Sequence, residues 1–321
     1  MRASLALTPT GDFVARPEQL DLFAPAAAPA DRSLGGATSS RPRPPGSLRL
    51  FVLGSGSGGN ALVAEAEGRR VLLDAGFSAR EIVRRLRLGG LDPRDLEAIV
   101  VTHEHGDHAR GAEQLSKRFK LPVWASAHSW TARSLRRVER AHRFQPGDRF
   151  ELAGFRLHSF PVPHDARQPV GLVLESAAGL RLGLVADLGR VTRQVLEALT
   201  DLDLLVLECN HDERMLETGP YPWPLKRRVA SDLGHLSNSG AARLIGELVR
   251  GASPPRLSDI VLYHLSATNN CPVLARETCL RALGRHARST RITMTCQETP
   301  TGWLEVGSQL PLRHEAPERT A

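Results

Sequence analysis

The sequence predicts an α/β protein in which two mixed β-sheets are sandwiched between helices. Short apolar segments of strand length alternate with segments of helical spacing along most of the chain. Successive strands joined by brief turns predict meanders, and the helices that follow predict crossover connections. The second half of the chain repeats this kind of alternation. Meanders combined with crossover helices are typical of a layered α/β architecture.

The first half opens with alternating apolar residues at 48–53, followed by a Gly/Ser turn at 54–59 and two further short strands. The apolar run at 98–101 has the composition of a buried strand. The elements expected here are strands at 48–53, 60–64, 71–73, 98–101 and 123–124, and helices around 82–86, at 109–119 and, with many arginines, from about 129 to 141.

The second half continues with more strands than helices, and most polar candidate residues fall where its strands end. The elements expected here are strands near 155–162, 170–175, 181–186, 203–207 and 259–263, and helices at 190–199 and 239–250.

The two ends of the chain lack any helical or strand period. Residues 1–47 are rich in Pro and Ala and predict a disordered leader. Residues 308–321 predict a polar tail. A single folded domain is therefore expected at 48–307.

Composition indicates a cytoplasmic globular protein. The chain has 321 residues, of which 41% are hydrophobic, and no apolar run approaches the roughly 20 residues that cross a bilayer. The N-terminus does not have the pattern of a secretory signal. The four cysteines form no CxxC pair, so a bound metal is expected on His and carboxylate ligands, which favours Zn, Mn or Fe.

The basic charge has two interpretations. A net charge of +7 suits a polyanionic partner such as nucleic acid. However, only three of the 42 basic residues are lysine, and a chain so rich in Ala and Arg also fits GC-rich codon usage. Charge alone does not decide between them.

The segment Thr102-His103-Glu104-His105-Gly106-Asp107-His108 predicts a metal site. It follows a buried-type strand, where a rigid scaffold can present several side chains to one point. Residues 103, 105 and 107 can share one side of the chain, while His108 turns to a neighbouring point. Imidazoles and a carboxylate are the expected ligands of Zn, Mn or Fe.

Two alternatives are open for this loop. The zinc-protease helix motif HExxH begins correctly at His103 but fails because residue 107 is Asp. A surface histidine patch is the other interpretation, and the position of three His and an Asp at the end of a strand argues against it.

Four distant residues are candidates to complete the site: His164, Asp187, His235 and His264. Three of them follow predicted strands, and His235 lies just before a predicted helix. Each alone is more often a capping or core polar residue than a ligand. Their shared placement favours the site.

These residues, in the order HxHxDH, His164, Asp187 and His264, resemble the metallo-β-lactamase fold superfamily over residues 48 to about 305. Within it the chain is similar to the WalJ (YycJ) branch of bacterial hydrolases. The branch motifs are Gly54-Ser55-Gly56-Ser57-Gly58-Gly59-Asn60, Asp74-Ala75-Gly76, Glu208-Cys209-Asn210-His211-Asp212, Gly234-His235-Leu236-Ser237-Asn238 and His264-Leu265-Ser266 with Asn269-Asn270.

The resemblance implies a four-layer αβ/βα sandwich with two divalent metal ions, Zn or Mn, with Fe as a further option. It implies that His103, His105 and His164 hold the first ion, that Asp107, His108 and His264 hold the second, and that Asp187 bridges both. Asp74 would orient the His loop. His235 would contact the phosphate, and Asp107 and His235 are the expected catalytic residues.

The implied reaction is hydrolysis of a phosphodiester, with DNA attacked 5′ to 3′ as an exonuclease substrate. The basic segments 133–140 and 226–228 and the aromatic Tyr221 and Trp223 could contact nucleic acid, so Tyr221, Lys226, Arg227 and Arg228 are candidate substrate residues. A solvated helix face and a packed Pro-rich loop explain them equally well.

Three other functions are weighed. One is a phosphodiesterase for small cyclic phosphodiesters, and another is a non-catalytic binding protein that keeps the fold. The presence of every expected ligand argues against the latter. A thioester hydrolase of the glyoxalase II type shares the HxHxDH loop, but the Gly-His-Leu-Ser-Asn and His-Leu-Ser stretches favour the phosphodiesterases.

Overall fold

The computed structural model of the chain describes residues 47–251 and 256–306. The leader and tail predicted for 1–47 and 308–321 therefore lie outside the described residues, apart from Ser47. Within the described ranges no helix is both long and apolar enough to span a bilayer.

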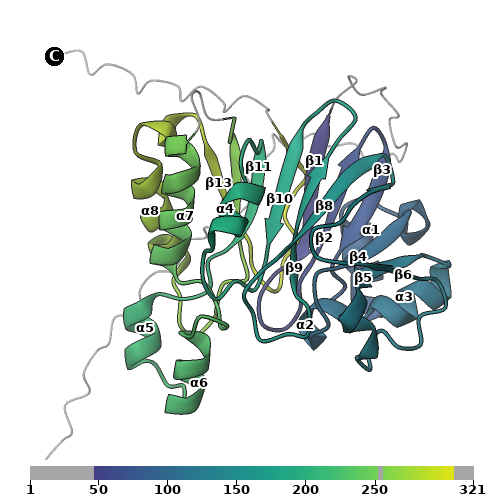
Figure 1. Cartoon of the computed structure of the whole chain (residues 1–321), viewed down its shortest axis with the longest axis horizontal. Helices are drawn as coiled ribbons and strands as arrows, with labels where there is room; N and C mark the ends of the chain where they lie inside the picture. Colours follow the sequence, from purple (N-terminus) through teal and green to yellow (C-terminus); the bar gives the residue numbers. More distant parts are fainter. Residues whose placement is uncertain (1–46, 252–255, 307–321) are drawn as a thin grey trace, which may run out of the picture.

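Two seven-stranded sheets pack face to face and carry helices on their outer faces (Figure 1). The first sheet has the order β14-β1-β2-β3-β4-β5-β6 and the second β13-β12-β11-β10-β9-β8-β7. The strands of the first sheet are β1 (Leu48–Gly54), β2 (Ala61–Ala66), β3 (Arg69–Leu73), β4 (Ala98–Val101), β5 (Val123–Ser126), β6 (Ala141–Phe144) and β14 (Leu304–Glu305). Those of the second are β7 (Arg149–Leu152), β8 (Phe155–Pro161), β9 (Val170–Glu175), β10 (Arg181–Val185), β11 (Leu204–Glu208), β12 (Asp259–Tyr263) and β13 (Arg291–Met294).

The two sheets share one pairing pattern, in which three antiparallel pairs are followed by three parallel pairs. In the first sheet the pairing changes at β3 and β4, and in the second at β10 and β11. Each half of the chain thus forms a meander followed by crossovers, which confirms the predicted α/β sandwich of two mixed sheets.

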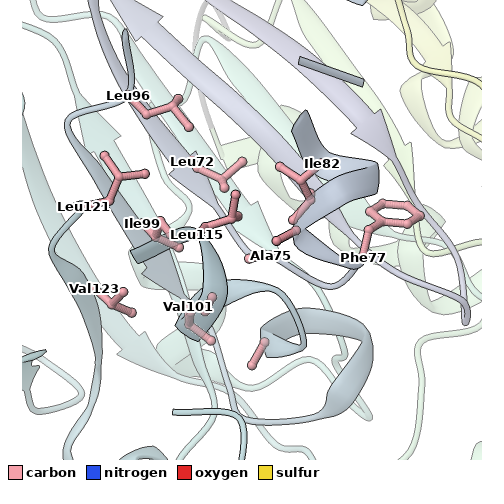
Figure 2. Packing of buried hydrophobic residues seen from close by; sticks show 14 of the residues in the cluster. Leu72, Ala75, Phe77, Ile82, Leu96, Ile99, Val101, Leu115, Leu121 and Val123 are labelled. Atoms are coloured by element: carbon pink, nitrogen blue, oxygen red, sulfur yellow. The ribbon is translucent and has the colours of Figure 1, made fainter. Parts of the chain in front are cut away.

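Strand residues alternate between two apolar layers because successive side chains point to opposite faces of a sheet. In β3, Val71 and Leu73 pack between the sheets, whereas Leu72 packs under the outer helices. Figure 2 shows this outer layer, where Leu72 and Ile99 meet Ile82 and Leu115. Strands that are buried on both faces have continuous apolar runs, and this explains the composition of the sequence at 98–101.

Helices cover both outer faces. On the first sheet lie α1 (Ala79–Leu88) and α3 (Ala112–Phe119), and on the second lie α4 (Arg193–Ala198), α7 (Asn238–Gly251) and α8 (Pro272–Leu283). Shorter helical segments are α2 (Gly106–Ala109), α5 (Glu213–Thr218) and α6 (Trp223–Val229), and the 3-10 turns are Pro93–Asp95, Ala127–Thr131 and Gly284–Arg288. Helices α5 and α6 lie together at one end of the molecule (Figure 1).

The basic helix predicted from 129 to 141 is wrong. The segment forms a 3-10 turn at Ala127–Thr131, further tight turns, and then strand β6. The amide of Val123 donates to the carbonyl of Arg140, so β5 recruits the end of this segment as a parallel edge strand.

Candidate metal centre

The predicted ligands meet where the ends of strands from both sheets converge. The first sheet contributes the loop after β4, which carries His103, His105, Asp107 and His108. The second sheet contributes His164 after β8, Asp187 after β10 and His264 after β12. The structure therefore brings together seven side chains that span 162 positions of the sequence.

Asp187 lies between two groups of side chains. Its Oδ2 is 3.3 Å from Nε2 of His103 and 3.3 Å from Nε2 of His164. Its Oδ1 is 3.0 Å from Nδ1 of His264 and 3.4 Å from Nε2 of His108. One carboxylate oxygen thus faces each group.

The remaining two members complete these groups. Nδ1 of His105 is 3.3 Å from Nε2 of His164, and Oδ2 of Asp107 is 3.4 Å from Nε2 of His264. His105 and Asp107 are also the more exposed members, since the others are at most 5% exposed. The cluster therefore opens to solvent on the side of the loop after β4.

The donor set fits divalent cations. Nε2 of His103 and Oδ1 of Asp187 are buried and have no hydrogen-bond partner among the described residues. Buried polar atoms are almost always paired, and leaving one unpaired costs about 1–3 kcal/mol. A cation between the imidazoles and Asp187 would satisfy both atoms.

Hydrogen bonds behind the ligands set their orientation. Nδ1 of His108 lies 2.7 Å from Asp74, whose other oxygen accepts from the amide of Thr102 at 2.8 Å. Nδ1 of His164 lies 3.0 Å from the carbonyl of Gly234. Because the Nδ1 atoms are engaged in this way, Nε2 of each ring faces the cluster.

Three of the site carboxylates and imidazoles have left-handed backbones. Asp74, Asp187 and His264 have φ values of 58°, 51° and 57°. Residues other than glycine rarely adopt such angles, and they are held there by the surrounding structure. Each lies directly after a strand, so this conformation turns the side chain from the strand end into the cluster.

Glu208, at the end of β11, begins one of the branch motifs but is not among the site residues expected from the sequence. Its Oε1 lies 2.7 Å from Nδ1 of His235 and 3.0 Å from Nδ1 of His264. Its Oε2 accepts from the amides of Leu188 and Leu236. The signal that could have found it is its position at a strand end, which it shares with Asp187 and His264.

Glu208 also sets the state of His235. Burial alone would lower the pKa of this imidazole, but the carboxylate of Glu208 outweighs it and raises the pKa above its usual value. Because Glu208 holds Nδ1, the proton that His235 can offer is the one on Nε2. The ring lies beside His164 and His264, with centroid separations of 5.3 and 5.2 Å.

The glycine turn after β1 supports the group that contains Asp107, His108 and His264. Nδ2 of Asn60 donates to the carbonyls of Gly56 and Asp107 and lies 3.1 Å from Nε2 of His108. Its Oδ1 accepts from Oγ of Ser55, which in turn accepts from the amide of His264 at 2.7 Å. This turn therefore joins Asp107 of the first sheet to His264 of the second.

The proposed substrate residues lie outside the cluster. Arg228 on α6 pairs with Asp165 at 2.6 Å, and Asp165 lies 3.3 Å from His164. Nζ of Lys226 donates to the carbonyl of Glu217. Tyr221 and Arg227 make no contact with the cluster within the part of the chain that the structure describes.

Comparison with known proteins shows which family the chain resembles in sequence. Residues 69–255 match the family described as the beta-lactamase superfamily domain. The chain is 33% identical over 240 residues to "Exodeoxyribonuclease YycJ" of Bacillus anthracis, covering 74% of this chain and 89% of that protein. It is 34% identical over 247 residues to "Exodeoxyribonuclease WalJ" of Streptococcus pneumoniae, with the same two coverages.

A solved structure shows the same fold. The metallo-beta-lactamase fold protein YhfI of Bacillus subtilis aligns with a TM-score of 0.62 at 16% identity, covering 81% of this chain and 99% of that one. The four-layer arrangement of two mixed sheets is thus the metallo-β-lactamase fold.

Proposed function

Because the chain belongs to the beta-lactamase superfamily, in the branch of the YycJ and WalJ proteins, and is a metal-dependent hydrolase, we propose that it is a DNA exonuclease with two metal ions. The observation that carries the proposal is the position of Asp187, with one oxygen toward each group of ligands. We assign His103, His105 and His164 to one ion, Asp107, His108 and His264 to the other, and Asp187 to both.

Two such ions, when bound, supply an activated water nucleophile and offset the charge on phosphoryl oxygens. The side chains of the protein perform the remaining tasks. Glu208 holds Nδ1 of His235 and favours its protonated form, so Nε2 can give a proton to the leaving oxygen. Asp74 holds His108, and so fixes the direction in which that ring faces the cluster.

Basic residues on both sides of the cluster support a nucleic-acid substrate. On one side, the turn with exposed Arg133, Arg136 and Arg137 approaches the His loop, since Oγ of Ser134 donates to the carbonyl of Glu104 at 3.4 Å. Clustered arginines attract phosphate backbones by releasing counterions.

On the other side lies α6, with Lys226, Arg227 and Arg228, preceded by Tyr221. Trp223 is 67% exposed and could stack on a base. Arg228 is linked through Asp165 to His164, so α6 borders the cluster directly. We propose that DNA crosses the cluster between these two basic surfaces. The enzyme would then cleave the strand from its 5′ end.

Two further assignments accompany the function. We propose that the hydrolase domain comprises residues 48–307. We also propose a cytoplasmic location, because all four cysteines are free thiols, as expected in a reducing compartment.

The test compares substrates with Mn or Zn present. Purified protein is incubated with 5′-phosphorylated duplex DNA, single-stranded DNA, RNA, bis(p-nitrophenyl) phosphate and a cyclic ribose phosphate. We expect mononucleotides released from the 5′ ends of DNA by the wild type, and none by Asp107→Ala.

Two results would overturn the proposal. If DNA stays intact while the cyclic phosphate is cleaved, the enzyme is a small-molecule phosphodiesterase. If no substrate is cleaved and metal analysis finds no bound ion, the assignment of the cluster itself is wrong.

A further inference from the structure

A cavity of about 530 Å³ lies beside the cluster, between α4 and the start of α7. This volume lies within the roughly 300–1,000 Å³ typical of small-ligand sites. His235 lines the cavity and lies beside His164 and His264 of the cluster, so this ring stands between the two. A ligand in the cavity would therefore lie next to the phosphate on which the cluster acts.

The cavity is built by the loops that carry the site residues. Arg190 follows Asp187 by three positions, His211 follows Glu208 by three, and Ser237 follows His235 by two; all three line the cavity. His211 and Ser237 are joined by a parallel bridge. The cavity and the cluster thus share one framework.

The buried wall of the cavity contains an imidazole with an unpaired nitrogen. His211 is 3% exposed, and its Nδ1 has no hydrogen-bond partner among the described residues. Burial lowers the pKa of this imidazole, so it is neutral and can either donate or accept. Leu196 supplies partly exposed apolar surface beside it, against which a base or sugar can pack.

The outer wall carries cations and anions. Arg243 on α7 is exposed and forms no ion pair within residues 47–251 and 256–306. Arg190 pairs with Asp232 at 3.5 Å, but both side chains are more than half exposed, and such pairs are weak. The carboxylates Glu213 and Glu247 also line the cavity, and Glu213 already accepts from Ser237. The wall therefore suits a nucleoside that carries one phosphate better than a polyanion.

We propose that this cavity binds the 5′-terminal nucleotide of the DNA, with its base and sugar inside and its 5′-phosphate toward Arg243. The proposal rests on the proposed exonuclease function. In the reaction, an oxygen from water bonds to phosphorus while that water releases a proton to solvent, and the bond between phosphorus and O3′ of this nucleotide breaks. O3′ keeps the electron pair and takes a proton from Nε2 of His235, which regains one from solvent. The products are a nucleoside 5′-monophosphate in the cavity and a strand with a new 5′-phosphate.

The test measures product binding. Deoxyadenosine 5′-monophosphate and inorganic phosphate are titrated into metal-loaded protein by calorimetry. The variants are Ala230→Trp, which places a large ring at the exposed end of α6 where it lines the cavity, and Arg243→Glu. Arg250→Glu is the matched control, an exposed arginine on the same helix that does not line the cavity.

We expect the nucleotide to bind the wild type at least tenfold more tightly than phosphate does, because phosphate lacks the base and sugar that fill the cavity. Both cavity variants should lose this preference, while Arg250→Glu keeps it. Equal binding of the two ligands to the wild type, or an unchanged preference in both variants, overturns the proposal.

A hydrolysis assay on the same proteins separates this proposal from the exonuclease function. If the wild type cleaves neither DNA nor bis(p-nitrophenyl) phosphate, the proposed function fails. Loss of the nucleotide preference in the cavity variants still establishes the binding site in that case. If hydrolysis proceeds but the preference is absent, the cavity proposal alone fails.

Discussion

Single carboxylates determine how the cluster is organised. Asp187 faces both groups of ligands. Glu208 instead holds the rings of His235 and His264 by their Nδ1 atoms. Both are buried, at 1% and 0% exposure. A buried carboxylate that orients ligands influences metal binding and catalysis through the side chains it holds.

Replacing Glu208 by Gln should reduce kcat on 5′-phosphorylated duplex DNA about 10- to 100-fold. The amide lacks the negative charge that favours protonated His235 and cannot accept equally from two imidazoles. The ion assigned to His264 should also bind more weakly, because Glu208 holds this ring by Nδ1. The checks are steady-state kinetics and metal analysis, with Glu217→Gln on the exposed face of α5 as the control. An unchanged kcat would contradict this role.

Replacing Asn60 by Ala should selectively weaken binding of the second ion, the one assigned to Asp107, His108 and His264. Asn60 is fully buried and joins Asp107 to the glycine turn that supports His264. We expect the affinity of this ion to fall about 10- to 100-fold, with the other ion unaffected.

Stepwise metal titration measures both affinities. Thr295→Ala serves as the control, because it removes a buried hydrogen bond to Leu262 without touching the cluster. Equal weakening of both ions would show that Asn60 supports the fold in general.

At the level of elements, two connections place the His loop. The turn after β3 packs its backbone against the loop, where the amide of Ala75 donates to the carbonyl of His108 at 2.6 Å. Helix α1 supports the glycine turn, since Nη1 of Arg85 donates to the carbonyls of Leu53 and Gln297. Each connection gives a prediction.

Gly76→Ala should displace the His loop. A Cβ at Gly76 would overlap the carbonyl of Asp107 and crowd the amide of Asn60. We expect the free energy of unfolding to fall by about 1–3 kcal/mol, together with a loss of bound metal. Urea unfolding and metal analysis test this. Gly302→Ala, where an added Cβ meets no atom within 4 Å, should change stability by less than about 0.5 kcal/mol. Equal effects of the two substitutions would refute the steric argument.

Glu81 in α1 should make stability depend on pH in the acid range. Hydrogen bonds from Arg84 lower the pKa of Glu81 from 4.5 to about 2, against a smaller effect of burial, and Arg85 adds to the lowering. A lowered folded-state pKa contributes stability above pH 4.5 that is lost as the pH falls through about 2.

Glu81→Gln should therefore be less stable than the wild type at pH 7, by no more than about 1 kcal/mol because solvent screens the pair. The two proteins should converge near pH 2. Urea unfolding across this pH range measures the difference, and a constant difference at all pH values would contradict the assignment.

Across the whole molecule, the cluster links the two sheets. Four of the assigned ligands lie on the loop after β4 of the first sheet, and three follow strands of the second. Ions bound there would hold the sheets together at one edge, where the apolar layer between them ends. Metal binding should therefore stabilise the entire fold.

Chelation of the metal should lower the melting temperature, and adding Zn or Mn should restore it. An ion present at 100 times its Kd contributes about 2.7 kcal/mol to the free energy of unfolding. Differential scanning calorimetry with and without chelator measures this, and Asp187→Asn should show a much smaller shift. A melting temperature that does not respond to chelator would mean that no stabilising ion is bound.

The sequence by itself was sufficient for the class of fold and for the members of the cluster. Apolar runs such as 98–101 identify buried strands because residues packed on both faces must be apolar. The polar residues directly after the strands, among them Asp187 and His264, are then candidates for one site. These are local properties of the chain, and they are visible without coordinates.

Only the tertiary structure decided which atoms face each other. The segment 129–141 does not form the predicted α-helix, because β5 pairs with the end of the segment as a strand, and this contact depends on residues outside it. The role of Glu208 depends on two imidazoles that follow it by 27 and 56 positions. The cavity beside His235 likewise arises from three separate loops. Contacts between distant segments depend on how the sheets pack, and local sequence patterns carry no record of them.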